Sequence, residues 1–554
     1  YHVSSSAKDS LGRTGSTALL HLVGELKKRP SLKNDIVLLF SSAELGDNWR
    51  EESALANHPL VRQYEVILKI EDLNIAKSPK LYFTSKFYYK LVKDFAQEAN
   101  VSSAGNSHPR PLKRNTTLEL VQYLGNQPLQ QYQGPPENAI YVLTDPLTGI
   151  HNPHLKNIDE AVQKFMKKWG IPGGSVAISR NEKLVYARGF GYAHQETRTL
   201  VQPEHLFRIA SISKPITAVA ILKLVQEGKL QLDTKVFGHE GVLSDSTFGV
   251  IADNRVKDIT NHHLLEHSGG WDRAKSGDLM IDPINIANKM QILPPADTRN
   301  IIRFVLSLPL DFAPGSRYVY SNIGYGILGR VIEQITNTPY EDYVTTTILQ
   351  PLGISNMRIG TSLPQAQQSP EVWYYTSLGE RLVPSMYGVN IQVPFAYGGF
   401  NLEAMDAHGG WIASAPDLLR FMAAVDGFNN RPDILSPSTL QLMVTPSETL
   451  NSGYGLGWWV NSQNNWCHTG SLPGSSALLE RNSNGYSWVI LFNRRSEAEP
   501  YFDELYQLIR NEIEEVQHWP EYDLFQMDAS DLIPPVVLPD TISISHYSPK
   551  NTSF

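Results

Sequence analysis

The sequence predicts an α/β domain at the N-terminus followed by an α+β domain. In residues 1–150, a helical pattern at 17–29 precedes two short aliphatic runs at 36–40 and 66–70, which are typical of strands covered on both faces. In residues 151–518, strand patterns stand at both ends and helical patterns lie between them. We therefore expect the second domain to contain one sheet, flanked by helices, that is closed by strands from the two chain ends of the domain.

The domain boundaries follow from length and from clusters of turn-forming residues. A chain of 554 residues exceeds a single ordinary core. Proline, glycine and asparagine concentrate at 133–157, around a strand-like run at 139–143, which places the first boundary near residue 150. The proline-rich stretch 532–539 predicts that residues 519–554 form an irregular C-terminal tail.

The elements of the second domain can be placed in order. A helix is predicted at 158–169, and strands at 175–179 and 183–191 form a hairpin around Asn181 and Glu182. A helix rich in alanine, isoleucine, leucine and valine follows Ser211 and runs to Val225. Strands are predicted again at 457–460, 476–479 and 487–492, before an amphipathic helix at 497–515.

Composition excludes several classes of function. The net charge of −8 comes without a basic stripe, so nucleic acid is not an expected partner. No run approaches the roughly 18 apolar residues of a membrane span. The single cysteine, Cys467, excludes an internal disulfide framework and a cysteine-based metal site. Glycosylation sequons at Asn100, Asn115 and Asn551 favour a secreted or extracytoplasmic location, although the sequence does not decide it.

Ser211 and Lys214 form an S-x-x-K pair at the start of the apolar helix. A serine hydroxyl becomes a good nucleophile when a neighbouring base takes its proton, and a lysine can do this when burial keeps it neutral. Pro215 places the pair in the first helical turn, because a proline is tolerated only where the N–H has no helical partner. Since Ser5 and Lys8 match the same pattern in a polar stretch, the pair needs support from other residues.

Two further motifs supply that support. Tyr320 and Asn322 form the chain's one Y-x-N sequence, which offers a second proton carrier and a positioning amide. The run His468, Thr469, Gly470 and Ser471 begins an edge-like strand that can align a substrate. We expect the backbone N–H groups of Ser211 and Ser471 to form an oxyanion hole.

In this order the three motifs resemble those of the active-site serine hydrolases of the β-lactamase and penicillin-binding-protein superfamily. The stretches 264–271 (LLEHSGGW), 407–414 (AHGGWIAS) and 468–474 (HTGSLPG) look like its class C-like branch of esterases and D-amino-acid peptidases. The resemblance implies an antiparallel sheet flanked by helices, with an all-α subdomain. It also implies that Ser211 is acylated, that Lys214 and Tyr320 carry protons, and that no metal or cofactor takes part.

The resemblance further implies that Asn322 and the strand His468 to Ser471 bind a small molecule or a short peptide. His468 departs from the family, in which lactamases and transpeptidases usually carry a lysine that recognises a carboxylate. A histidine with an ordinary pKa of about 6.5 does this poorly at neutral pH. We therefore expect hydrolysis of a peptide, amide or ester before that of an antibiotic. The alternative is a catalytically retired protein that serves as a binding or structural module.

Two patterns raise the question of zinc. His263 and His267 match H-x-x-E-H, but the Ser-Gly-Gly that follows ends the helix at once, so we expect structural histidines that hydrogen-bond the loop.

Residues 1–145 more faintly resemble a two-zinc aminopeptidase, with Asp9, Glu44 and Asp72 at candidate strand ends. The family's His-x-Asp reads His2-Val-Ser4 here, and its paired glutamates read Ala43-Glu44, which removes the general base. We therefore expect a degenerate, non-catalytic domain. A working zinc aminopeptidase would instead require stoichiometric zinc in the purified protein.

Overall fold

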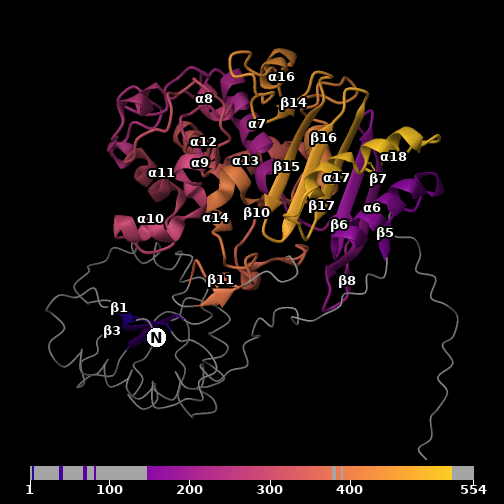
Figure 1. Cartoon of the computed structure of the whole chain (residues 1–554), viewed down its shortest axis with the longest axis horizontal. Helices are drawn as coiled ribbons and strands as arrows, with labels where there is room; N and C mark the ends of the chain where they lie inside the picture. Colours follow the sequence, from indigo (N-terminus) through magenta and orange to yellow (C-terminus); the bar gives the residue numbers. More distant parts are fainter. Residues whose placement is uncertain are drawn as a thin grey trace, which may run out of the picture. The chain divides into compact units, whose positions relative to one another are not determined.

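A computed structural model describes residues 146–376, 382–387 and 391–526, together with four short strands within the first 82 residues (Figure 1). The chain divides into two compact units. One consists of residues 1–138 with 387–391, and the other consists of residues 139–386 with 392–554. Each unit is described by itself.

The first unit contains a four-stranded sheet. Its strands lie in the order β1 (Val3–Ser4), β2 (Val37–Phe40), β3 (Ile67–Glu71) and β4 (Lys80–Tyr82). The first three are parallel and β4 is antiparallel to β3. The strands predicted at 36–40 and 66–70 are confirmed. The predicted helix at 17–29, the strand-like run at 139–143, and His2, Asp9, Glu44 and Asp72 lie outside the described residues.

The second unit is built on a larger sheet, in which strands from the beginning and the end of the unit's sequence pair with each other. Its strand order is β14-β15-β16-β17-β6-β7-β5, with β8 added to β7. Every pairing is antiparallel, and β17 from the end of the unit pairs with β6 from its beginning, with Val489 opposite Ala177. The prediction that the two chain ends of this domain close one sheet is therefore confirmed. The strands are β5 (Leu147–Gly149), β6 (Gly173–Arg180), β7 (Lys183–His194), β8 (Thr199–Leu200), β14 (Trp459–Val460), β15 (Trp466–Leu472), β16 (Ser475–Arg481) and β17 (Tyr486–Phe492).

Helices cover one face of this sheet. Side chains of α6 (Lys156–Trp169), α17 (Tyr501–Gln507) and α18 (Arg510–Glu515) share a buried core with β6, β7, β16 and β17, and Figure 1 shows the three helices across this face. Phe165 stacks on Phe492 with ring centroids 5.6 Å apart. The single helix predicted at 497–515 is wrong, because it begins only after Pro500, which lacks an N–H, and is interrupted at Leu508 and Ile509.

Further helices lie beyond the other face of the sheet (Figure 1). In the sequence, they fall between the strands at the beginning of the unit and those at its end. The largest are α7 (Ser213–Gln226), α11 (Thr298–Leu306) and α12 (Asn322–Thr336), and α15 (Ala415–Met422) packs on β6 and β17. The shorter ones are α8 (Asn261–Leu265), α9 (Arg273–Ser276), α10 (Pro283–Met290), α13 (Tyr340–Val344), α14 (Leu402–Met405) and α16 (Pro437–Met443). Among the described helices, none is both long and apolar enough to cross a membrane.

A small sheet lies next to the candidate site, because one of its strands leads directly to Ser211. It consists of β10 (Arg358–Ile359), β13 (Trp411–Ala413) and β9 (Phe207–Arg208) in that order. Beyond it, β11 (Val383–Pro384) and β12 (Gln392–Val393) form a separate antiparallel pair. At the end of the described chain, residues 519–526 form no helix or strand, and the Leu524 N–H donates to the Leu184 carbonyl at 2.8 Å.

Candidate active site

Ser211 lies in a tight turn between β9 and α7. The turn is the short helix η2 (Ala210–Ile212), in which Ala210 has a φ of +48°, a left-handed conformation that a residue with a Cβ rarely adopts. The Ser213 hydroxyl donates to the Ala210 carbonyl at 2.7 Å and accepts from the Trp411 N–H at 3.2 Å. β13 therefore holds the turn, and Ser211 stays partly exposed between two buried neighbours.

Lys214 lies one helical turn after Ser211 and reaches back to it. Its Nζ lies 3.1 Å from Ser211 Oγ and donates to Asn322 Oδ1 and to the His408 carbonyl, both at 2.8 Å. The carbonyl comes from η9 (Asp406–Gly410), a single wide helical turn before β13. Three segments far apart in the sequence thus fix the amine beside the serine.

Burial sets the charge state of Lys214. The side chain is completely buried in the apolar helix α7. Burial lowers the pKa of Lys214 well below its usual value, the Asp278 carboxylate opposes this shift, and the Arg273 guanidinium adds to it. A neutral amine has a lone pair directed at its neighbours, so this lysine can accept the proton of Ser211.

Tyr320 lies on the other side of the amine, just before α12. Lys214 Nζ is 4.8 Å from the centroid of the Tyr320 ring. Burial raises the pKa of Tyr320, and a hydrogen bond with the Ser211 hydroxyl opposes that shift. The phenol is therefore protonated at neutral pH and within reach of Ser211, where it can donate a proton.

His267 supports Tyr320 from behind. Its ring stacks 4.3 Å from the Tyr320 ring, and its Nδ1 accepts the Ser321 N–H at 3.1 Å. Burial lowers the pKa of His267 well below its usual value, and the nearby Lys214 adds to this shift. The neutral ring accepts at Nδ1 and therefore carries its proton on Nε2.

Asn322 is held from both ends of its amide. Oδ1 accepts from Lys214, while Nδ2 donates to Asp278 Oδ2 at 2.5 Å. The other oxygen of Asp278 accepts the Met280 N–H at 3.2 Å. Asp278 therefore fixes which way the amide points, and the amide in turn positions the amine.

β15 passes close to the turn that carries Ser211. A Cβ built on Gly470 would lie 2.1 Å from the Ile209 carbonyl oxygen, so only glycine allows this approach. β14 pairs with β15 only at Trp466 and Cys467. In the described chain, the rest of that edge of β15 has no strand partner, as the sequence predicts for an edge-like strand.

His468 is not placed as a substrate ligand. It is 2% exposed, its Nδ1 donates to the Thr469 carbonyl at 2.7 Å, and its Nε2 lies 3.2 Å from the Tyr454 hydroxyl. Since Nδ1 carries the proton, Nε2 must accept from Tyr454. Burial, reinforced by Lys214, lowers the pKa of His468 to about 3. The ring is therefore neutral, and both of its nitrogens are engaged within the protein.

Thr469 and Ser471 lie on the opposite face of β15 from His468 and Gly470. The alternation of buried and partly exposed residues along the strand shows this. Ser471 Oγ accepts from Arg495 Nη1 at 2.8 Å. The side chains of His468 and Thr469 therefore point to opposite faces of the sheet, so the two cannot contact one ligand from the same face.

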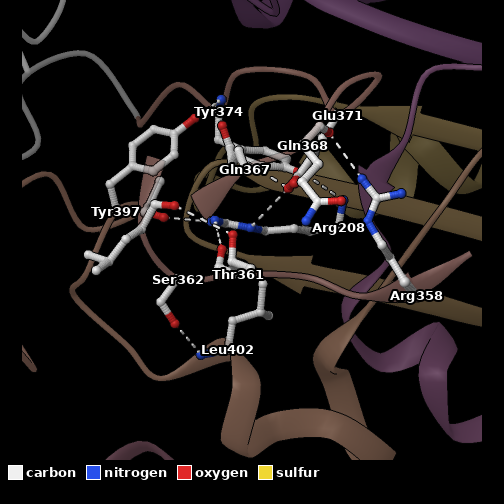
Figure 2. Close-up of polar contacts among 12 residues, drawn as sticks. Arg208, Arg358, Thr361, Ser362, Gln367, Gln368, Glu371, Tyr374, Tyr397 and Leu402 are labelled. Atoms are coloured by element: carbon white, nitrogen blue, oxygen red, sulfur yellow. Dashed lines mark hydrogen bonds and ion pairs between the residues drawn. The ribbon is translucent and has the colours of Figure 1, made fainter. Parts of the chain in front are cut away.

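Arg208, three residues before Ser211, is the centre of a buried polar cluster (Figure 2). Its guanidinium is completely buried and stacks 4.1 Å from the Tyr374 ring. It donates to the Thr361 carbonyl at 2.8 Å and to the Ala396 carbonyl at 2.5 Å, and it faces Glu371, with Nε 3.9 Å from the carboxylate. One side chain thus joins both ends of the segment 361–396 to the strand that leads to Ser211.

The chain that follows residue 396 packs against the turn that carries Ser211 and against β15. Ala210 from the turn and Leu472 from β15 share an apolar cluster with Phe400, Leu402 and Met405. The cluster therefore connects the Arg208 anchor with the two backbone segments expected to form the oxyanion hole.

A pocket opens beside Tyr320 and Asn322. Trp271, Leu279 and Ile323 contribute apolar walls, and Arg273 and Asp278 contribute charges. The centre of the Arg273 guanidinium lies 5.3 Å from the Tyr320 ring centroid. The pocket therefore borders two of the predicted site residues.

The two histidines of the H-x-x-E-H pattern have separate structural roles. His263 pairs reciprocally with Thr260 in a capping box at the start of α8, whereas His267 binds the Ser321 N–H. Among the described residues, no group of three or more histidine, cysteine or acidic side chains could hold a metal ion.

Sequence reasoning missed several residues of this site. Asp278, Arg273 and Tyr454 lie in stretches that carry no sequence motif, and the helix α9 that Arg273 begins is only four residues long. Arg208 did have a signal, since an arginine between Phe207 and Ile209 in an apolar strand must be buried and must find partners.

Comparison with known proteins gives a consistent relationship. A family model described as Beta-lactamase matches residues 158–510, more than half of the chain. Protein flp of Staphylococcus aureus (strain N315) is 26% identical over 359 residues, which cover 64% of this chain and 66% of flp, just under two thirds of its length. Esterase EstB of Burkholderia gladioli is 27% identical over 350 residues, covering 60% of this chain and 86% of EstB.

A solved structure shows the same fold. D-amino acid amidase from Ochrobactrum anthropi SV3, complexed with L-phenylalanine, superposes with a TM-score of 0.51 at 21% identity, covering 65% of this chain and 98% of the amidase. The resemblance drawn from the three sequence motifs is confirmed at the level of family and fold. The chain belongs to the beta-lactamase family.

Proposed function

We propose that this chain is a serine hydrolase that forms an acyl-enzyme on Ser211 and then hydrolyses it. One observation carries the proposal: the completely buried Lys214 amine, whose charged form is disfavoured, lies 3.1 Å from Ser211 Oγ. A serine that only capped a helix would have no need of a neutral amine held by Asn322 and the His408 carbonyl.

In the acylation step, the Lys214 amine takes the proton of Ser211 while Oγ bonds to the substrate carbonyl carbon. The carbonyl oxygen becomes an oxyanion, which the backbone N–H groups of Ser211 and Ser471 stabilise. As the oxyanion collapses, Tyr320 donates its proton to the leaving amine or alcohol, and the proton on Lys214 returns to Tyr320. The acyl-enzyme and the first product remain, and the protonation of the site is unchanged.

In the deacylation step, a water molecule attacks the acyl carbonyl. Its proton passes to the site base, its oxygen bonds to the carbonyl carbon, and the bond to Ser211 Oγ breaks. Oγ recovers a proton, so serine and a free acid result. Asn322 keeps the amine in line throughout, because Asp278 fixes its amide.

The unpaired edge of β15 aligns the substrate through its backbone at Thr469, Gly470 and Ser471. His468 contributes by packing, with its ring 6.3 Å from the Tyr320 ring, and supplies no charge. Without a fixed cation at that position, a small peptide, amide or ester is the preferred substrate class. The names of the relatives, an esterase and an amidase, support this range.

A fluorophosphonate probe tests the proposal on the intact protein. It should label the wild type, and mass spectrometry should locate the adduct on Ser211. Ser211→Ala should abolish labelling, whereas Ser5→Ala, at the other S-x-x-K serine, should label like the wild type. Absence of labelling, with Ser211→Ala unchanged toward every substrate tried, would support a retired enzyme that acts as a binding module.

A substrate panel then resolves the bond type. p-Nitrophenyl esters, D- and L-aminoacyl amides and a chromogenic cephalosporin should be compared at equal concentration. We expect ester or aminoacyl amide hydrolysis to exceed cephalosporin hydrolysis. Faster cephalosporin turnover would contradict the preference drawn from the neutral His468.

A further inference from the structure

We propose that Arg273 binds an anionic group on the substrate, so that the preferred substrates carry a carboxylate at the end of a short apolar acyl chain. The inference rests on the proposed function and names its substrate class. It is carried by the position of Arg273 in the pocket beside Tyr320, and by its guanidinium having no charge partner among the residues that the structure describes.

Arg273 begins α9 and lies at the rim of the candidate site. Its guanidinium is solvent-exposed and lies over the Tyr320 ring, at 5.3 Å from the centroid. The same pocket wall contains Asn322, which binds Lys214. The guanidinium therefore lies in a pocket that is lined by two residues of the candidate site, Tyr320 and Asn322.

The two carboxylates near the pocket, Asp272 and Asp278, already accept hydrogen bonds within the protein. Asp272 accepts from Arg317 Nη2 at 2.8 Å and from the Ala274 N–H at 3.0 Å. Asp278 accepts from the Asn322 amide and from the Met280 N–H. Within the described chain, Arg273 forms no ion pair or side-chain hydrogen bond. Its donors are therefore available to a ligand.

Among the described residues that line this pocket, Arg273 carries the one fixed positive charge. Lys214 is buried with its charged form disfavoured, and His468 is buried and neutral. Trp271, Leu279 and Ile323 give the pocket an apolar wall beside Arg273. An apolar wall favours contact with methylene groups, and a guanidinium recognises a carboxylate in a bidentate manner.

A matched pair of esters tests the inference. Mono-4-nitrophenyl glutarate and 4-nitrophenyl pentanoate share the leaving group and chain length, and differ in a terminal carboxylate against a methyl group. The wild type should prefer the glutarate in kcat/KM. Arg273→Gln should reduce that ratio roughly five- to tenfold, as expected for one charge-assisted contact near solvent, and Arg273→Lys should reduce it less.

Lys275→Gln is the control, because it removes an equal charge from α9 at a residue that does not line the pocket. It should leave the ratio unchanged. The ratio also cancels any effect of Arg273 on Lys214, since both esters need the same base. The preference should weaken as salt increases.

Two outcomes overturn the inference, and they are distinguishable. If the wild type hydrolyses both esters but Arg273→Gln leaves their ratio unchanged, the anion site is wrong and the serine hydrolase stands. If neither ester is hydrolysed faster than by Ser211→Ala, the proposed function fails and the inference fails with it.

Discussion

The Nε2 atom of His468 lies 3.2 Å from the hydroxyl of Tyr454, from which the neutral ring accepts a hydrogen bond. Its other nitrogen donates to a backbone carbonyl at 2.7 Å, so a second proton would have to be placed on Nε2, which burial disfavours. His468 stands where the resemblance leads one to expect a charged lysine, and it is buried and neutral.

The first prediction concerns acid stability. Burial lowers the pKa of His468 to about 3, while an unfolded histidine titrates near 6.5. The unfolded state therefore binds more protons between these values. The stability contribution is present above about pH 6.5 and is lost as the pH falls toward 3, at up to about 1.4 kcal/mol per pH unit. Urea unfolding of wild type and His468→Gln at pH 7, 6 and 5 should show a shallower decline for the variant.

The buried His267 and His408 contribute in the same direction, so the variant should keep part of the decline. His239→Gln is the control, because His239 is exposed, and it should unfold with the wild-type pH dependence. An identical pH dependence in His468→Gln and wild type would show that His468 takes up a proton in the folded state.

The second prediction concerns the pH dependence of the reaction. Since Lys214 acts as a base only when neutral, kcat/KM should rise with pH through the Lys214 pKa. The Asp278 carboxylate raises that pKa against the effect of burial. Asp278→Asn removes this charge with little change in size, so the rise should move to lower pH.

Asp245→Asn serves as the control for the second prediction. Asp245 caps the distant η3 (Ser246–Phe248), and its variant should leave the pH profile in place. At pH values above the Lys214 pKa, Lys214→Met should lower kcat/KM by about a hundred- to ten-thousandfold, the usual range for a general base. If Asp278→Asn leaves the pH profile unchanged, Asp278 does not influence the pKa of the base.

Local spacing explains which parts of this site the sequence predicts. Ser211 and Lys214 are three residues apart, and helical geometry alone brings them to one face. Gly470 is predictable as a close approach, because glycine in a strand usually marks one. The hairpin at Asn181 and Glu182 likewise follows from its flanking strands, and both residues adopt the positive φ that a two-residue turn requires.

Contacts between distant segments could not be predicted in the same way. His267 meets Tyr320 and Tyr454 only because α8, α12 and the loop before β14 converge, and no spacing in the sequence encodes that meeting. The charge of His468 was predicted to be weak from its ordinary pKa, but its burial depends on the packed tyrosines around it. The amide orientation of Asn322 depends on Asp278, which lies in a stretch without periodicity.

The third prediction concerns Gly470. A methyl group there would lie 2.1 Å from the Ile209 carbonyl oxygen, and both atoms belong to backbone segments that cannot move independently of the site. Gly470→Ala should separate β15 from the Ser211 turn. We expect a loss of about 1–3 kcal/mol in the free energy of unfolding and a fall in kcat/KM of at least about a hundredfold.

Gly326→Ala provides the matched control within α12. Its added methyl would meet Thr298 and Met280 at 3.5 to 3.6 Å, an ordinary contact distance. Because alanine is the better helix former, this variant should be neutral or stabilised by up to about 1 kcal/mol. Urea unfolding and ester hydrolysis measure both variants. Equal behaviour of the two would show that β15 does not need the close approach.

The fourth prediction concerns the Arg208 anchor. Arg208→Met removes the bonds to the Thr361 and Ala396 carbonyls and leaves Glu371 buried without its cation. Burial already raises the pKa of Glu371, and Arg208 opposes that shift. The variant should therefore lose about 3–5 kcal/mol of stability at pH 7, the usual effect of breaking a buried pair.

Arg208→Lys keeps the charge but cannot donate to two carbonyls in one plane or stack as fully on Tyr374, so it should fall between wild type and Arg208→Met. Adding Glu371→Gln to Arg208→Met should recover part of the loss, because it removes the uncompensated carboxylate. Urea unfolding of wild type, Arg208→Met, Glu371→Gln and the double variant gives the coupling energy directly. If the double variant is no more stable than Arg208→Met, the loss arises from the two carbonyls alone, and the ion pair contributes nothing to holding the segment 361–396 against the strand that carries Ser211.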